Sequence, residues 1–242
     1  MSTAETAPAA SGRGLFITGT DTGVGKTLAA ALLALRLRTA GRPCSYLKPM
    51  ETGIADRQTL ENEADGAKVK KAAALEEPLA AIIPYTFREP LAPLLAARRE
   101  GRVVSRDELL ATVTRHLEEH PFSLVEGAGG LLVPLAPGFL LLDLIREVRL
   151  PALVVCRSAL GGVNHTLMTL RCLRQAGVPV AGLVVNHLTG RPGIAERHFI
   201  EQVAEFDPAP VIAELPHLPG INYTREELLP LCDRLHLERL AG

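Results

Sequence analysis

The chain has 242 residues, a formal net charge of −1, 47% apolar residues and 22% charged residues. This composition is typical of a globular protein, and the length provides enough apolar material for a sizeable core. The near-zero charge gives the chain no broad basic surface, which argues against nucleic acid as a partner.

Residues 1–13 are rich in Ala, Ser, Thr and Pro and lack the apolar run of a signal peptide. We therefore expect a disordered N-terminal tail over 1–13, followed by one domain over 14–242 without internal repeats or linkers. The longest apolar stretch, 131–145, contains two prolines and Asp143 and is too short to span a bilayer, so no membrane partner is expected. The four cysteines have neither zinc nor redox spacing, which fits a reduced, cytoplasmic setting.

Short apolar runs alternate with longer helical patterns along the rest of the chain. Strands are expected at 14–18, 45–48, 122–126, 152–156, 180–186 and, as a weaker pattern, 211–215. Helices are expected at 26–40, from after a polar loop 51–61 through Leu75, at 106–119 with Ser105 as N-cap, at 163–176 and at 224–235. The proline-rich residues 78–93 are not assigned. Strands buried on both faces and joined by helices predict an α/β fold with a single doubly wound, mainly parallel sheet flanked by helices.

The sequence Gly19-Thr-Asp-Thr-Gly-Val-Gly-Lys-Thr27 lies between the first predicted strand and the first predicted helix, which is the context of a phosphate-binding loop (P-loop). Its glycines let backbone N–H groups point at phosphate oxygens, and the helix N-terminus adds positive potential. Lys26 is expected to reach the β- and γ-phosphates, and the Thr27 hydroxyl to ligate Mg²⁺. Thr20 stands where the strict pattern has Gly, and an incidental Gly-rich turn is the alternative, which the flanking strand and helix disfavour. The loop predicts a P-loop NTPase type of fold.

Three polar residues end predicted strands at the edge of the sheet where the P-loop lies. Glu126 is followed by glycines and is a candidate to complete the magnesium site, although a structural turn is the alternative. Lys48 can neutralise a transferring phosphoryl group, or it is an ordinary surface lysine. The amide of Asn186 can bind a base edge, or it caps a turn.

Other candidates carry weaker signals. The pair Gly161-Gly162 precedes a predicted helix and either binds a carboxylate at the helix N-terminus or forms a flexible turn. His116 and His120 are four residues apart, but the neighbouring residues lack the zincin pattern, so a solvated helix end is favoured. The acidic run that contains Asp65 indicates, by pattern alone, a solvated helix face.

Five motifs, in this order, resemble the dethiobiotin synthetase family over nearly the whole chain after the tail. They are Thr18-Gly-Thr-Asp-Thr-Gly-Val-Gly-Lys-Thr27, Tyr46-Leu-Lys-Pro49, Pro84-Tyr-Thr-Phe87 with Pro90, Val125-Glu-Gly-Ala-Gly-Gly130, and Leu160-Gly-Gly-Val-Asn-His165. The resemblance implies a reaction of 7,8-diaminononanoate, CO₂ and ATP. An amine is carboxylated to a carbamate, the carbamate takes the γ-phosphoryl group, and the neighbouring amine expels phosphate. The products would be dethiobiotin, ADP and phosphate.

By resemblance, Lys26 and Lys48 would be catalytic, and Thr27, Asp65 and Glu126 would surround Mg²⁺. Thr52 would contact the diamine, and the family's homodimer would bring in residues of the partner copy that hold the substrate carboxylate: Leu160, Gly161 and Asn164. The nucleotide would be bound by Gly23, Val24, Gly25, Lys26, Thr27, Leu28, Asp65, Glu126, Gly127, Ala128, Gly129, Asn186, His187, Pro216, His217 and Leu218.

Two positions depart from the family pattern, because many members have Asp where His187 stands and some have Glu where Gly23 stands. The first departure leaves strictness for ATP open. Two other functions are alternatives. A cobyrinate-type amidating ligase would need an ammonia source, and a partition-type ATPase switch would carry a second lysine where Asp21 stands. The expected partners are therefore small molecules and a second copy of the chain.

Overall fold

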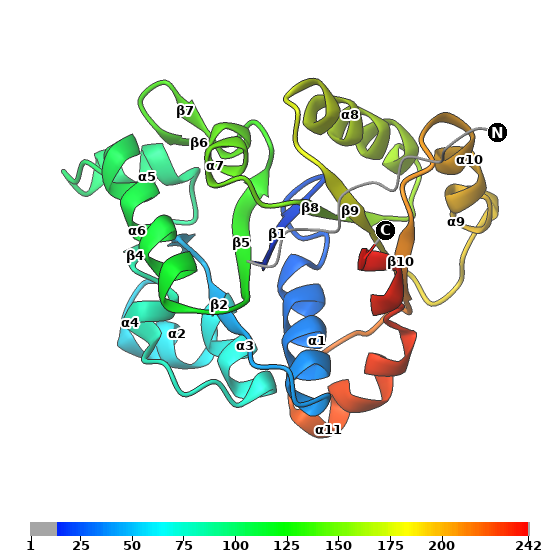
Figure 1. The fold of residues 1–242 in the computed structure, drawn as a ribbon, viewed down its shortest axis with the longest axis horizontal. Helices are drawn as coiled ribbons and strands as arrows, with labels where there is room; N and C mark the ends of the chain where they lie inside the picture. The colour runs from blue at the N-terminus through cyan, green and yellow to red at the C-terminus, as the bar shows by residue number, and fades with distance from the viewer. Residues whose placement is uncertain (1–13, 242) are drawn as a thin grey trace, which may run out of the picture.

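A six-stranded parallel sheet forms the centre of the computed structural model, which describes residues 14–241; the predicted tail 1–13 lies outside the described residues (Figure 1). The strand order is β10-β9-β8-β1-β5-β2. The bounds are β1 (Gly14–Gly19), β2 (Ser45–Leu47), β5 (Ser123–Gly130), β8 (Ala152–Arg157), β9 (Val180–Asn186) and β10 (Val211–Leu215). The predicted α/β fold with one doubly wound sheet is confirmed.

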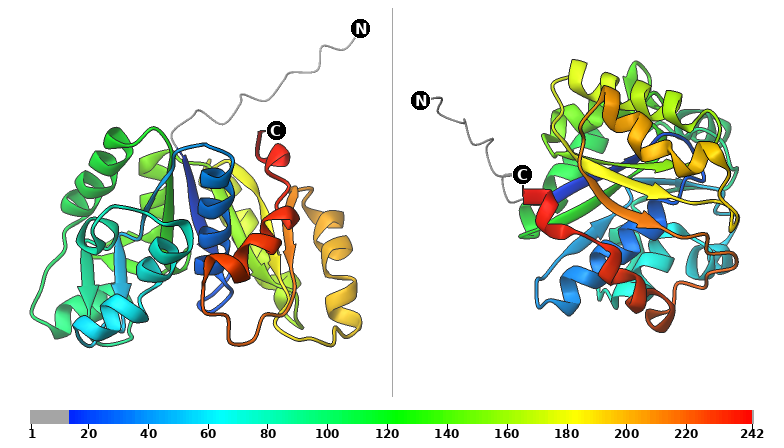
Figure 2. Two further views of the ribbon diagram at one scale, coloured as in Figure 1. Left: turned by 90° about the horizontal axis from the view of Figure 1, so that it is seen from below. Right: turned by 90° about the vertical axis from the view of Figure 1, so that its right-hand side faces the viewer.

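Helices cover both faces of this sheet, and each face has its own apolar cluster (Figure 2). Alternate residues of β1 divide between the clusters, since Leu15 and Ile17 belong to one and Phe16 to the other. The helices are α1 (Lys26–Thr39) and α3 (Asp65–Ala73) on the first face, and α6 (Arg106–Glu119), α7 (Leu141–Val148), α8 (Gly162–Gln175) and α10 (Phe199–Phe206) on the second. Of the helices described, none is both long and apolar enough to cross a bilayer.

Smaller elements fill the connections between the main ones. Two short strand pairs are present, parallel β3 (Met50–Thr52) with β4 (Tyr85–Phe87) and antiparallel β6 (Pro134–Ala136) with β7 (Phe139–Leu140). The short helices are α2 (Arg57–Asn62), α4 (Leu79–Ile82), α5 (Pro93–Arg99), α9 (Ile194–Arg197) and α11 (Arg225–Leu228). The prediction of a loop over 51–61 was therefore wrong, because β3 pairs with a strand distant in the sequence and Asp56 caps α2 through Thr59 N.

Two further predictions of local structure were wrong. The helix expected at 224–235 ends after one turn at Leu228, and 3₁₀ turns follow. Pro230 explains this, because it lacks an N–H and its ring clashes with the preceding helical turn. The glycines after Glu126 continue β5 instead of turning, and a Cβ at Gly127 would lie 2.7 Å from Leu141. Glycine is therefore required there by close packing.

His116 is buried, so the prediction of a solvated helix end was wrong at this residue. Its Nε2 lies 2.9 Å from Ser45 Oγ, which lies 2.9 Å from Ser123 Oγ. Those serines face α6 from neighbouring strands, and only the tertiary fold brings them to the histidine. Burial, with a smaller effect of His120, lowers the pKa of His116 to about 4.

The stability of the protein should depend on pH through His116. Between pH 6.5 and about 4, an unfolded His116 binds a proton while the buried one stays neutral, so the free energy of unfolding should fall as the pH is lowered. We expect a decrease of about 1–3 kcal/mol from this residue, measured by urea denaturation across the window. His116→Gln keeps a partner for Ser45 but does not titrate, so it should flatten the dependence. Equal slopes in the two proteins would contradict the assignment.

Candidate functional site

The P-loop, residues 19–27, connects the carboxyl end of β1 to the N-terminus of α1, as predicted. Gly25 has a left-handed φ of 99°, and a Cβ there would lie 2.4 Å from Asn186 Nδ2, so both conformation and space require glycine. Lys26 Nζ donates to Asp21 O at 2.9 Å. Burial lowers the pKa of Lys26 to about 8, while Glu126 opposes the shift. The lysine is thus held in the loop by a neutral carbonyl.

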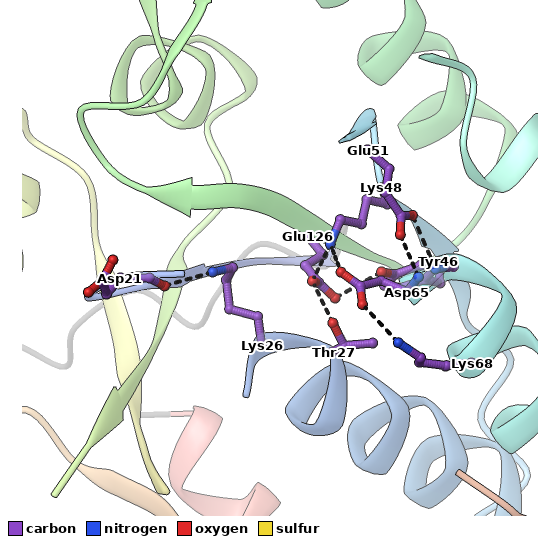
Figure 3. A network of polar contacts seen from close by, with 10 residues as sticks. Asp21, Lys26, Thr27, Tyr46, Lys48, Glu51, Asp65, Lys68 and Glu126 are labelled. Carbon is purple, nitrogen blue, oxygen red and sulfur yellow. Dashed lines mark hydrogen bonds and ion pairs between the residues drawn. The ribbon is translucent and has the colours of Figure 1, made fainter. Parts of the chain in front are cut away.

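Glu126 is fully buried in the middle of β5 and accepts hydrogen bonds from three donors (Figure 3). Oε1 accepts from Thr27 Oγ1 at 3.1 Å and from Lys48 Nζ at 2.8 Å, and Oε2 accepts from Tyr46 OH at 2.8 Å. The sequence analysis missed Tyr46. The spacing of Tyr46 and Lys48 could have indicated it. Residues two apart on a strand share a face, so Tyr46 is expected on the same side of the sheet as Lys48.

Lys48 lies between Glu126 and Asp65 and forms an ion pair with each (Figure 3). Burial opposes the charged lysine, but Glu126, Asp65 and Glu51 together raise its pKa well above the usual value. Burial likewise opposes ionisation of Asp65. The charge and hydrogen bond of Lys48, with smaller effects of Lys68 and Thr27, together outweigh it, so the pKa of Asp65 is lowered. The cluster is therefore a charged one. The alternative of an ordinary surface lysine is excluded, because Lys48 is 5% exposed.

Glu51 holds the helix that carries Asp65, and the sequence analysis also missed this residue. Its Oε1 accepts from Asp65 N at 2.5 Å and its Oε2 from Gly66 N at 3.4 Å. The N-cap position of α3 is Ala64, whose side chain cannot accept a hydrogen bond. Glu51, which lies in β3, supplies the acceptors for the first N–H groups of α3 instead. Burial raises the pKa of Glu51 to about 7, although Lys48 opposes the shift. No local pattern marks such a cap, because it lies 14 residues from its helix.

A cavity of about 650 Å³ opens beside this cluster. Its walls include Gly23, Lys26, Lys48, Thr52, Asp65 and Ala128. The carboxylates of Asp65 and Glu126 and the hydroxyl of Thr27 supply the oxygen donors that a hard cation such as Mg²⁺ prefers. The predicted substrate residue Thr52 lines the cavity, whereas Leu160, Gly161 and Asn164 lie at the start of α8, with Leu160 91% exposed.

The residues expected around the base lie at the ends of β9 and β10. Asn186 Nδ2 donates to Val24 O at 3.0 Å, so its amide supports the P-loop. His187 lies 2.6 Å from Ser158 Oγ through Nδ1 and 2.6 Å from Glu214 Oε1 through Nε2. A second cavity, of about 520 Å³, is lined by His187, Pro216 and His217 among others, while Leu218 packs against the apolar core.

Removing the charge of Lys48 should destabilise the fold. Lys48→Ala leaves Glu126 and Asp65 without their buried partner, so we expect the free energy of unfolding to fall by about 2–4 kcal/mol in urea denaturation without Mg²⁺. Lys68→Ala is the matched control, because Lys68 lies 3.6 Å from Asp65 and has a side chain 32% exposed. It should cost less than about 1 kcal/mol. Similar small losses in both variants would argue against a tightly coupled Lys48 cluster.

Comparisons with known proteins identify relatives of this chain. Residues 13–225 match a protein family described as an AAA domain. Over 174 residues, the chain is 45% identical to the ATP-dependent dethiobiotin synthetase of Anaeromyxobacter dehalogenans (strain 2CP-C), which covers 72% of this chain and 76% of the relative. Over 231 residues it is 34% identical to the protein of the same name from Bacillus subtilis (strain 168), covering 95% of this chain and 98% of the relative.

Solved structures share the architecture at low sequence identity. A ParA family ATPase from Chlorobium tepidum TLS has a TM-score of 0.57 at 9% identity, covering 94% of this chain and 99% of the other. The MinC:MinD cell division protein complex of Aquifex aeolicus gives a TM-score of 0.57 at 16% identity, covering 94% and 93%. At such identities the likeness shows the fold alone. The similarity to the curated relatives extends over most of both sequences, and on that ground the chain belongs to the ATP-dependent dethiobiotin synthetase family.

Proposed function

We propose that this chain is an ATP- and Mg²⁺-dependent cyclo-ligase that converts 7,8-diaminononanoate and CO₂ into dethiobiotin, with ATP converted to ADP and phosphate. The observation that carries the proposal is Lys48, a buried ammonium group 2.8 Å from Glu126 in the wall of the P-loop cavity. A fixed cation there suits a reaction in which the carbamate and the transferring phosphoryl group are both negatively charged. Membership of the family supports the identity of the substrates.

The reaction requires three bond-forming steps. One amine of the diamine attacks CO₂ and loses a proton, which gives the carbamate. A carbamate oxygen then attacks the γ-phosphorus as the bond to the β-phosphate oxygen breaks, which gives ADP and a mixed anhydride. The second amine attacks the carbonyl carbon and loses a proton, the bond to phosphate breaks, and the ureido ring closes.

The two lysines would act differently in these steps. Lys48 has a raised pKa and stays protonated, so it would act by its charge on the carbamate and the transferring phosphoryl group and not as a proton acceptor. Lys26 donates to the carbonyl of Asp21. It would exchange this neutral acceptor for a phosphate oxygen, because a charged acceptor forms the stronger hydrogen bond.

The oxygen donors fit Mg²⁺. Thr27, Asp65 and Glu126 converge at the N-terminus of α1, where Thr27 and Glu126 are joined by a hydrogen bond and Lys48 contacts both carboxylates. Thr27, Asp65 and Glu126 would hold the ion. When bound, it would neutralise charge on the phosphate oxygens.

The remaining proposed binding residues lie in or near the two cavities. The triphosphate would contact the P-loop and the start of α1 through Gly23, Val24, Gly25, Lys26, Thr27 and Leu28. It would also contact Asp65 and the β5 residues Glu126, Gly127, Ala128 and Gly129. The base would lie near Asn186, His187, Pro216, His217 and Leu218. Thr52 would contact the diamine in the P-loop cavity.

We also propose a homodimer in the cytoplasm, with small molecules as its other partners. Leu160, Gly161 and Asn164 lie at the start of α8, apart from the lining of the P-loop cavity. In a homodimer they would hold the substrate carboxylate in the partner's site. The apolar side chain of Leu160 is 91% exposed, and burial against a second copy would be favourable.

The first experiment measures phosphate release from ATP with Mg²⁺ and bicarbonate, with and without 7,8-diaminononanoate, and identifies the product by mass. We expect release that depends on the diamine and a product with the mass of dethiobiotin. Lys48→Ala should reduce turnover by at least about 100-fold, the size of effect that follows removal of one group stabilising transition-state charge. Release that ignores the diamine, with no product, would overturn the proposed reaction while leaving the P-loop assignment intact.

His187 should affect nucleotide choice and not the diamine. Its ring contacts Ser158 and Glu214, and it lines the second cavity. His187→Asp would place a carboxylate beside Glu214, so the repulsion should displace this wall. We expect altered ratios of kcat/KM for ATP, CTP and GTP, with the diamine KM unchanged. Identical ratios in both proteins would remove His187 from base selection.

A further inference from the structure

Tyr223 lies between β10 and α11, and neither the sequence motifs nor the proposed function give it a role. It lines the same cavity as Lys26, Lys48 and Asp65. Among the described residues, all others that line this cavity fall within 22–133, so Tyr223 is the contribution of the C-terminal segment. This location raises the question of what its side chain does there.

The backbone of Tyr223 is in the left-handed region, with φ of 56°. Few non-glycine residues adopt this conformation, which costs about 1–2 kcal/mol. The two others in the described chain, Ala74 and Arg149, are the C-caps of α3 and α7, where a left-handed residue is usual. Tyr223 ends no helix and instead precedes Thr224, the N-cap of α11. Helix capping therefore does not account for its conformation.

A network around Glu227 fixes the turn that contains Tyr223. Glu227 Oε2 accepts from Asn222 N at 2.9 Å and from Thr224 N at 3.4 Å, and Oε1 accepts from Asn222 Nδ2 at 3.2 Å. The residues on both sides of Tyr223 are thus attached to one carboxylate. Strained residues persist where the surroundings determine them in this way, and they concentrate at functional sites.

The aromatic ring is held beside the charged cluster. Lys68 Nζ lies 5.8 Å from the ring centroid of Tyr223 and 3.6 Å from Asp65 Oδ1. Burial, followed by the negative charges of Asp65 and Glu126, raises the pKa of Tyr223 to about 12, so the hydroxyl keeps its proton. Within the part of the chain that the structure describes, this hydroxyl has no hydrogen-bond partner, although the site around it is built from paired polar groups.

We propose that Tyr223 is a further ligand-binding residue, whose phenolic O–H donates a hydrogen bond to an anionic oxygen of the bound reactants. Two sources share this chemistry, namely a phosphate oxygen of the nucleotide and a carboxylate oxygen of the carbamate. The second source rests on the proposed function, whereas the first rests only on the P-loop.

Tyr223→Phe removes the hydroxyl and keeps the ring, so it separates binding from packing. The matched control is Tyr85→Phe, whose hydroxyl lies 3.3 Å from Thr112 Oγ1 on the surface of α6. Calorimetry with a non-hydrolysable ATP analogue and Mg²⁺ would measure nucleotide Kd directly, and steady-state assays would measure kcat/KM for the diamine. The midpoint of thermal unfolding should stay the same in both variants.

If Tyr223 binds a phosphate oxygen, the Kd of the analogue should rise roughly 10- to 100-fold in Tyr223→Phe, as expected for a lost hydrogen bond to a charged group. If it binds the carbamate, that Kd should stay unchanged and kcat/KM for the diamine should fall by a similar factor. A variant equal to wild type in both measurements would overturn the proposal. Were the wild type inactive with the diamine, the proposed function would fail separately, and the analogue Kd alone would decide the role of Tyr223.

Discussion

The rest of the site depends on one interaction, the pairing of the Lys48 ammonium group with the carboxylates of Glu126 and Asp65. Charges removed from water are unfavourable unless they are paired and hydrogen-bonded. Here the pairing joins the end of β2, the middle of β5 and the start of α3. Because Glu126 also accepts from Thr27, the first turn of α1 is tied to the same group. The same ion pairs therefore determine both the charge distribution of the site and the positions of its side chains.

This arrangement gives the two lysines of the site different properties. Lys48 is paired with carboxylates, which raise its pKa and fix its charge at one place. Lys26 is paired with the Asp21 carbonyl, and burial lowers its pKa to about 8. The ion pairs of Lys48 thus belong to the folded structure itself and do not depend on a ligand. Lys26 is held by a weaker, neutral acceptor that a phosphate can replace. Because both ammonium groups are in position before the ligand binds, the site need not rearrange as charge develops in the reaction.

Further polar side chains fix the backbone around the site, namely the buried Glu51 and Asn186 and the exposed Glu227. Glu51 accepts from the first N–H groups of α3, and Asn186 donates to the carbonyl of Val24 in the P-loop. Glu227 does the same for the turn at Tyr223. Each holds main-chain atoms instead of touching the candidate reacting groups, so each positions a neighbour. Gly25 belongs to this arrangement, because only glycine lets the loop approach Asn186 closely.

The sequence by itself determined the parallel sheet, the P-loop and the expectation that Glu126 and Lys48 lie at the same edge of the sheet as the P-loop. Apolar runs mark buried strands, and the carboxyl ends of parallel strands share an edge. It assigned Asp65 only through the family resemblance. It did not give the burial of His116, the cap supplied by Glu51, the partner of Tyr46 or the strained turn at Tyr223. These depend on contacts between segments distant along the chain, such as Ser45 with His116, which are 71 residues apart. Periodicity and spacing record local geometry, whereas such contacts exist only after the helices have packed on the sheet.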